Sequence, residues 1–318
     1  MKGAALRRWR LDRGPLWVGA ATALLLANLI VGGRLLVDQW NERPRIPTVS
    51  RYRPDLSEFR RLTANSTGPA ALHRLKIAEA DGDGPRLSIN SFQLIYGSPR
   101  YRSTIVIDTG LDQRLHREFA GGGRFYPEAY ARLQRELLRT RAVYWTRESY
   151  DHVGGVSRSA DLYGIRDRLH FTKAQARSPK LTEGRFPPTV LEAMNTIACD
   201  VVCSPAPGLA LFAVPGDAPG AQWIFISAAN GREYMLVGDQ TIRHAQIADL
   251  QAHSRVWYWR ENRDADDIAH RLRALHDLQI AAPNLAIIPV HDENRIAQLI
   301  ATGWIGDGFD YDSPFAVR

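Results

Sequence analysis

The 318-residue chain is poor in cysteine and methionine, with two and three residues respectively, and it shows no internal repeat and no low-complexity tract. Two cysteines are too few for a disulfide-knot scaffold, and the lack of a Gly-X-Y period excludes a collagen-like protein. Hydrophobic residues make up 45% of the chain, which excludes a disordered protein and is enough to bury a large core. The composition therefore predicts a globular protein.

The folded part of the chain also lacks a basic cluster. The formal net charge is +7, of which residues 1–37 carry +5 and the other 281 residues only +2. Proteins that bind nucleic acids usually carry a basic face on their folded part. Nucleic acid is therefore not an expected partner, and the charge indicates a membrane topology instead.

One long uncharged run lies near the N-terminus. Pro15–Gly33 has 19 residues without a charge, and Leu35–Val37 extends the run past Arg34. About 20 helical residues cross a bilayer core of about 30 Å, so residues 15–37 are predicted to be a transmembrane helix that contacts lipid. The basic residues 1–14 are expected to stay in the cytoplasm. This places the C-terminal part, anchored to the inner membrane, in the periplasm or at the cell exterior. A cleaved signal peptide is the alternative.

The two segments that follow differ in composition. Residues 38–70 are polar and contain four prolines, so they are predicted to be a linker with one short helix around Leu56–Leu62. Residues 71–318 are predicted to form the globular domain. Strands there are expected at Leu87–Tyr96, Ser103–Asp108, Ala142–Trp145, Leu209–Val214, Trp223–Ser227, Tyr234–Val237 and Leu285–Val290, and helices at Tyr126–Thr140 and Asp264–Leu278. Polar residues recur where strands end, as in α/β proteins that build sites at strand ends.

Five motifs follow one another in this domain. They are STIVIDTG at 103–110, WTRESYDHVGG at 145–155, VPGDAPG at 214–220, MLVGD at 235–239 and IIPVHD at 287–292. In order and spacing they resemble the landmarks of the metallo-β-lactamase superfamily, over roughly residues 73–295. The resemblance implies an α/β fold, a four-layer αβ/βα sandwich of two mixed sheets.

The resemblance also implies a pair of metal sites that share a bridging aspartate. The residues at the positions of the second site are all suitable ligands, namely Asp151, His152, Asp239 and His291. The three histidine positions of the first site hold other residues, namely Arg147, Ser149 and Asp217. Loss of one site with retention of the other implies one divalent metal. Two histidines and two carboxylates suit zinc, with iron or manganese as alternatives, in a site left open to water.

Arg147 and Asp217 suggest a replacement for the missing metal. A guanidinium has no lone pair to give to a cation, so Arg147 excludes a metal from the first site. We expect Arg147 to approach Asp217, because an unpaired buried carboxylate costs several kcal/mol. The alternative is that both side chains point to solvent. Asp151 and Arg147 are expected to act in catalysis, and Arg147, Tyr150 and Asp217 to contact the substrate.

Four further features accompany these motifs. The resemblance implies that Asp108 shapes the loop that carries the ligands, and that Gly154 and Gly155 supply a tight turn after the Asp-His pair. Cys199 and Cys203 are open to three interpretations: a local disulfide, free buried thiols or metal ligands. The Trp257–Trp259 run is explained most simply by packing, with an aromatic wall of the cleft as the alternative.

Two functions are compatible with these expectations. The first is a membrane-anchored, mononuclear metal-dependent hydrolase of a small molecule that contains an ester, lactone, amide or phosphodiester bond. The second is a non-catalytic protein without a metal that keeps the fold as a scaffold and binds a ligand or an envelope protein.

Overall fold

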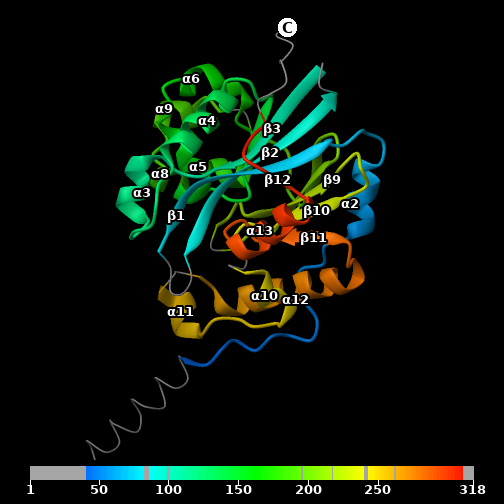
Figure 1. Ribbon diagram of the computed structural model, residues 1–318. Coiled ribbons are helices and arrows are strands. Elements are labelled where there is room, and N and C mark those ends of the chain that lie inside the picture. Colours follow the sequence, from blue (N-terminus) through cyan, green and yellow to red (C-terminus); the bar gives the residue numbers. More distant parts are fainter. Residues whose placement is uncertain are drawn as a thin grey trace, which may run out of the picture.

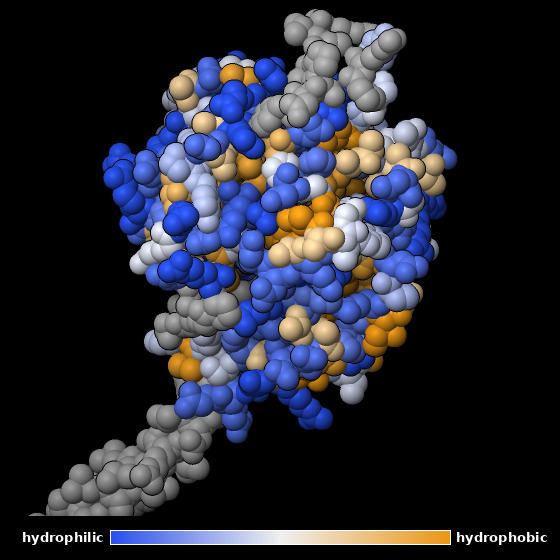
Figure 2. Space-filling model, in the orientation of Figure 1, coloured by the Kyte–Doolittle hydropathy of each residue, from blue (hydrophilic) through white to orange (hydrophobic). Residues whose placement is uncertain are grey.

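The computed structural model describes residues 41–81, 86–98, 101–194, 196–216, 218–239, 243–260 and 263–310. Within these residues, two five-stranded sheets lie face to face, and helices cover the outer face of each sheet (Figure 1). Hydrophilic residues cover most of the surface in the same view (Figure 2). The predicted α/β class is confirmed.

The first sheet has the strand order β12-β1-β2-β3-β4. Neighbours β1, β2 and β3 are antiparallel, whereas β4 pairs with β3 and β12 pairs with β1 in parallel. The strands are β1 (Ala71–Ala80), β2 (Leu87–Ser98), β3 (Tyr101–Thr109), β4 (Ala142–Tyr144) and β12 (Gly306–Asp307). The parallel β3–β4 pair brings the Asp108 and Thr146 segments to the same edge of the sheet.

The second sheet has the strand order β11-β10-β9-β8-β7 and is antiparallel except for the β10–β11 pair. The strands are β7 (Val202–Ala206), β8 (Leu209–Ala213), β9 (Gln222–Ser227), β10 (Glu233–Leu236) and β11 (Leu285–Ile288). A small separate sheet pairs β5 (Phe171–Thr172) with β6 (Thr196–Ile197). The predicted strands of both large sheets are confirmed.

The layering follows from strands that are apolar on both faces. On β9, Ile224 and Ile226 pack into the core between the two sheets, whereas Trp223 and Phe225 pack against the outer helices. Successive side chains of a strand point to opposite faces, so a continuous apolar run requires cover on both sides. Two such sheets therefore produce two outer helical layers.

The helices fall into two groups along the chain. The first group covers the first sheet: α3 (Gln113–Phe119), α4 (Pro127–Leu137), α5 (Tyr150–Ser157), α6 (Leu162–Ile165), the 3₁₀ turn η1 (Arg166–Arg168), α7 (Lys173–Ala176), α8 (Lys180–Glu183) and α9 (Pro188–Glu192). The later helices are α10 (His244–Ala248), α11 (Arg255–Arg260), α12 (Ala265–Ala281) and α13 (Glu293–Ala301). The predicted helices correspond to α4 and α12.

The described part of the predicted linker packs against the domain. The short helix expected there is present as α2 (Leu56–Thr63), and its Phe59 is almost fully buried against the second sheet. Residues 41–55, which we call the strap, run along α12, where Ser50 Oγ donates a hydrogen bond to the His270 carbonyl oxygen at 2.6 Å. The described part of this segment therefore contacts the domain through a few buried residues within a polar composition, and the division of the chain into linker and domain stays a prediction.

The predicted transmembrane segment, residues 15–37, lies outside the described residues. Among the described helices, none combines the length and the hydropathy that a membrane crossing needs.

Cys199 and Cys203 are joined by a disulfide, which decides among the three interpretations left open by the sequence. In the chain-entropy view, closing so short a loop stabilises the protein by about 2 kcal/mol. We expect the double variant Cys199→Ser/Cys203→Ser to lose about this much free energy of unfolding in a urea titration. A reductant should lower the stability of the wild type and leave the double variant unchanged. Equal stability of the oxidised wild type and the double variant would contradict this prediction.

Candidate metal centre

Four side chains from three segments meet at one edge of the sandwich. Asp151 and His152 begin α5, Asp239 follows β10, and His291 follows β11. One candidate ligand atom from each of these residues lies within 4.8 Å of the others. The four residues that were predicted as metal ligands are therefore brought together.

The cluster is centred on one oxygen of Asp239. Its Oδ1 lies 2.8 Å from His152 Nε2 and 2.9 Å from His291 Nε2. Asp151 Oδ2 lies 3.3 Å from His291 Nε2, and the two Nε2 atoms are 3.3 Å apart. Two imidazole nitrogens and two carboxylates at these separations form a donor set that zinc prefers.

The Nδ1 atom of each histidine interacts with a group outside the four-residue cluster. His291 Nδ1 donates to the Ser88 carbonyl oxygen at 2.8 Å, which leaves Nε2 as the ligand atom. His152 Nδ1 lies 3.0 Å from Asp108 Oδ2 and 3.0 Å from Thr146 Oγ1. Histidines that bind metals usually have such an outward partner, which fixes the ring and its tautomer. The surroundings of both rings therefore fit a metal between them.

Asp108 holds the loop between β4 and α5. It accepts hydrogen bonds from Thr146 N at 2.8 Å and from Thr146 Oγ1 at 2.7 Å. Its backbone has a φ of 55°, a left-handed conformation that non-glycine residues rarely adopt. This strained position turns the carboxylate toward both Thr146 and His152, in agreement with the predicted role of Asp108.

Arg147 pairs with a residue that the sequence did not indicate. Its buried guanidinium forms an ion pair with Oδ2 of Asp239, the oxygen that does not face the two histidines. Asp217, the expected partner, lies outside the described residues, so that contact stays a prediction. A fixed positive charge thus stands beside the carboxylate that would bridge two metals in the family.

Ser149 contributes in a way that the sequence analysis missed. It precedes α5, and its Oγ donates to Asp151 Oδ1 at 2.6 Å instead of to the helix backbone. A serine immediately before a helix is a familiar capping signal, and that signal was present in the sequence. The residue at a lost histidine position therefore orients a retained ligand.

The charges of the cluster shift its pKa values strongly. Burial opposes the ionisation of Asp239, but Arg147 and the two histidines outweigh it and hold the Asp239 pKa well below its usual range. Burial likewise opposes the protonation of His291, but Asp239 and Asp151 raise its pKa to about 9. The pKa of His152 is raised well above 6.5 by the surrounding carboxylates, in spite of burial. In the metal-free cluster, the surrounding carboxylates therefore favour the protonated form of both histidines.

Three other residues of the predicted loop motif, Tyr150, Gly154 and Gly155, lie in or at the start of α5. The Tyr150 ring stacks on Phe119 of α3 with 4.6 Å between the ring centroids, and its role in substrate contact stays a prediction. Gly154 and Gly155 lie inside α5, so the predicted tight turn is wrong. Gly155 is required because α5 packs closely on the end of β3: a Cβ on Gly155 would lie 1.9 Å from the Thr109 carbonyl oxygen.

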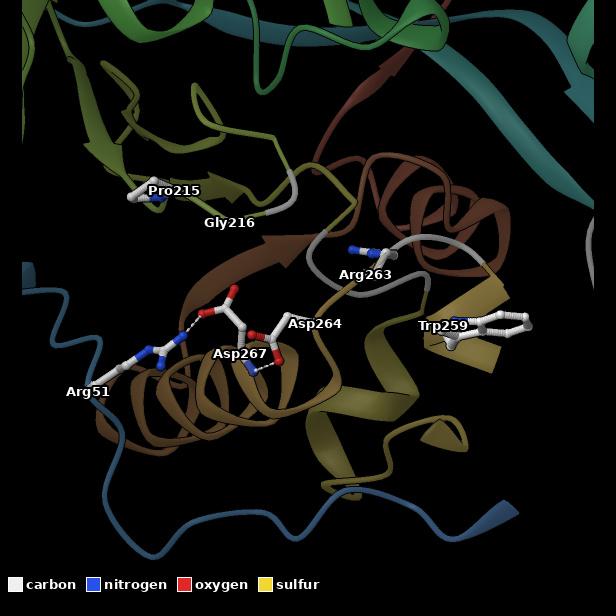
Figure 3. Close-up of a pocket in the computed structure, with 7 residues that line it drawn as sticks. All are labelled: Arg51, Pro215, Gly216, Trp259, Arg263, Asp264 and Asp267. Atoms are coloured by element: carbon white, nitrogen blue, oxygen red, sulfur yellow. Dashed lines mark hydrogen bonds and ion pairs between the residues drawn. The ribbon is translucent and has the colours of Figure 1, made fainter. Parts of the chain in front are cut away.

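A cavity of about 560 Å³ is connected to the cluster through one of its lining residues (the cavity is drawn in Figure 3). It is lined by Arg51, Pro215, Gly216, Trp259, Arg263, Asp264 and Asp267. Arg263 connects the two sites, because its guanidinium also donates to the backbone carbonyl oxygen of Asp239. Both carboxylates that line the cavity have partners. Asp264 accepts hydrogen bonds from backbone N–H groups in the first turn of α12. Asp267 forms ion pairs with Arg51 and Arg271 and accepts a hydrogen bond from the Tyr52 hydroxyl.

Comparison by sequence finds no matching protein-family model and no matching curated protein. Comparison by structure finds a quorum-quenching N-acyl homoserine lactone lactonase, with a TM-score of 0.56 and 14% identity over 72% of this chain and 95% of that one. An N-acyl homoserine lactone hydrolase, solved with its product bound at the catalytic metal centre, has a TM-score of 0.55 and 14% identity over 73% and 96%. A probable metal-dependent hydrolase from Staphylococcus aureus has a TM-score of 0.52 and 15% identity over 71% and 91%. The chain therefore has the metallo-β-lactamase fold, as its motifs predicted.

Proposed function

We propose that the protein is a membrane-anchored hydrolase that faces the periplasm and uses a single divalent metal, with zinc as the first choice. The observation that carries this proposal is the convergence of Asp151, His152, Asp239 and His291 within 4.8 Å. The proposed substrates contain an ester, lactone, amide or phosphodiester bond. The similarity of the fold to two lactone hydrolases and to a probable metal-dependent hydrolase supports this class of reaction.

A bound divalent metal would supply an acidified water and would polarise a carbonyl or phosphoryl oxygen. The chain itself contributes three further functions. Asp108 and the Ser88 carbonyl oxygen fix the two imidazoles. Asp151, the most exposed of the four ligands at 20%, is oriented by Ser149 and is suited to accept a proton from the attacking water. Arg147 offers a guanidinium to negative charge that develops on the substrate.

Arg147 also explains why one metal is proposed instead of two. Its guanidinium neutralises Asp239 Oδ2, the oxygen that a metal in the first site would require. Since a guanidinium carries no lone pair, it replaces the charge of that metal but not its open coordination position. A single ion must then hold both the substrate and the nucleophile, which we expect to make the enzyme slower or more selective than a dinuclear one.

The same contacts support a second candidate function. The ion pairs among Arg147, Asp239 and the two histidines neutralise the cluster without any metal. A chain that had lost catalysis would keep the scaffold stable in this way and would bind a ligand or an envelope protein. The amount of bound metal distinguishes this candidate from the hydrolase.

The periplasmic location is supported by two independent features. The uncharged run at residues 15–37 is long enough to cross a bilayer, and its basic flank favours a cytoplasmic N-terminus. The Cys199–Cys203 disulfide is typical of oxidising compartments such as the periplasm.

Metal analysis of the full-length protein tests the proposal. After equilibration with zinc and removal of the excess, we expect about one equivalent for the wild type. His291→Ala and Asp151→Ala should each bind less than about a tenth of that amount under the same conditions. Asp277→Ala is the matched control, since Asp277 is exposed and pairs with Arg273 four residues away on α12. Absence of zinc from the wild type would overturn the hydrolase in favour of the scaffold, and two equivalents would contradict the role of Arg147.

A further inference from the structure

We propose that the strap and helix α11 form a face that rests on the anionic headgroup layer of a bilayer, so that the cavity connected to the ligand cluster opens at the membrane surface. We call this surface the basal face, and it comprises residues 41–55 and 255–260. The inference rests on the membrane anchor of the proposed function but not on catalysis.

The length of the connecting chain constrains this face. The backbone N–H of Arg255, the first residue of α11, donates to the Glu42 carbonyl oxygen at 2.9 Å. Only five peptide units separate Glu42 from Val37, where the predicted membrane segment ends. An extended chain spans at most about 3.6 Å per residue, so Glu42 lies within about 18 Å of the end of that segment. If residues 15–37 cross the bilayer, α11 must therefore lie close to the bilayer surface.

The charge of the strap suits an anionic surface. Its four arginines, at positions 43, 45, 51 and 53, are all exposed, and its acidic residues are Glu42 and Asp55. Asp55 caps the first turn of α2, Arg51 pairs with Asp267, and the exposed Arg43 donates a hydrogen bond to Gln251 at 3.4 Å. Together with Arg43, the exposed Arg45 and Arg53 supply the positive charge of this face. Basic residues close to an anionic leaflet each contribute about 1 kcal/mol of attraction.

The aromatic residues of α11 suit the interface between headgroups and water. Tyr258 is buried, as the packing interpretation predicted, but the side chain of Trp259 is 65% exposed. Val49 of the strap is 62% exposed, so both elements present an apolar side chain among basic ones. In Figure 1 the strap and α11 form the lower edge of the molecule, and Figure 2 shows mainly hydrophilic residues with small apolar patches there. Tryptophan is enriched at membrane interfaces because its ring is apolar and its N–H is polar.

The cavity shares residues with the basal face. Arg51 of the strap and Trp259 of α11 both line it, as does Arg263 (Figure 3). Arg263 also donates a hydrogen bond to the Asp239 carbonyl oxygen. A ligand that enters between Arg51 and Trp259 would therefore come from the headgroup layer.

Fluorescence quenching in vesicles tests this inference with the full-length protein. Because both native cysteines are in a disulfide, Trp259→Cys provides a single site for a fluorescent label. The control is Tyr163→Cys on α6, a position that is 57% exposed and lies at the far end of the molecule from the strap (Figure 1). In phosphatidylcholine vesicles that contain phosphatidylglycerol, a nitroxide on the lipid headgroup should quench the label at 259 at least about twofold more than the label at 163. The triple variant Arg43→Glu/Arg45→Glu/Arg53→Glu should remove this difference.

Two failures are distinguishable in this experiment. If the full-length protein does not float with the vesicles, the membrane anchor is wrong and the inference fails with it. If the protein floats but both labels are quenched equally, the anchor stands and the proposed contact of the basal face is overturned. If the quenching at position 259 does not depend on phosphatidylglycerol or on the three arginine substitutions, the proposed contact between the basal face and anionic headgroups is also overturned.

Discussion

Gly155→Ala should lower the free energy of unfolding by about 3 kcal/mol or more and should reduce zinc binding with it. The added Cβ would lie 1.9 Å from the Thr109 carbonyl oxygen, a backbone atom that cannot move aside as a side chain can. The Gly155 backbone also donates to the Gly110 carbonyl oxygen at 2.9 Å, so α5 cannot shift without breaking this contact. Since α5 carries Asp151 and His152, its displacement should separate the ligands.

Gly164→Ala is the matched control for this substitution. Gly164 also lies in a helix, but a Cβ there would meet no atom within 4 Å. The control should change stability by less than about 1 kcal/mol, because alanine favours a helix where space allows. Chemical unfolding of both variants, with and without zinc, measures the two effects. Equal stability of the two variants would show that the close packing of α5 on β3 is not required.

Removal of the metal should reverse the pH dependence of stability between about pH 6.5 and pH 9. In the metal-free protein, burial disfavours protonation of His291, but Asp239 and Asp151 raise its pKa to about 9. Because the pKa of His291 is higher in the folded protein than in the unfolded chain, protonation of His291 stabilises the folded state fully below pH 6.5, the pKa in the unfolded chain. This stabilisation is lost as the pH rises to about 9, the pKa in the folded protein. The titration of His291 alone should lower the free energy of unfolding by on the order of 3 kcal/mol across this range.

The zinc-bound protein should respond in the opposite direction. A metal binds the neutral imidazoles, so protons compete with it, and the competition weakens as the pH rises. The stabilisation by zinc, measured as the difference in unfolding free energy with and without a chelator, should therefore increase from pH 6.5 to pH 9. His291→Ala should show little of this increase. Parallel pH profiles in the presence of zinc and of chelator would contradict the assignment of the four ligands.

Much of the fold could be predicted because its signals are local. Continuous apolar runs such as Trp223–Ser227 form strands that are covered on both faces, and the helical spacing after Asp264 gives α12. Asp264 itself accepts hydrogen bonds from Asp266 N and Asp267 N, the capping contact that such a position favours. The four candidate ligands were also found, since their motifs keep the family order.

The remaining features depend on contacts between distant segments. The ion pair between Arg147 and Asp239 joins residues 92 positions apart, and no local pattern in the sequence indicates it. The strap was predicted to be a linker because only isolated residues in it, Pro44 and Ser50, are buried. Gly155 was assigned to a turn because the sequence does not show that α5 lies against the Thr109 carbonyl oxygen.

The sequence by itself determined most strands of the two large sheets, though not β1, β7 and β12, and it determined which four residues are candidate ligands and that one set of histidines is missing. These properties follow from residue type and spacing along the chain, which a linear sequence contains in full. Only the tertiary structure decided that Arg147 neutralises Asp239, that Ser149 orients Asp151 and that the strap lies on α12 beside the cavity. Each of these contacts depends on side-chain direction and on the relative position of separate elements, which packing of the whole core fixes.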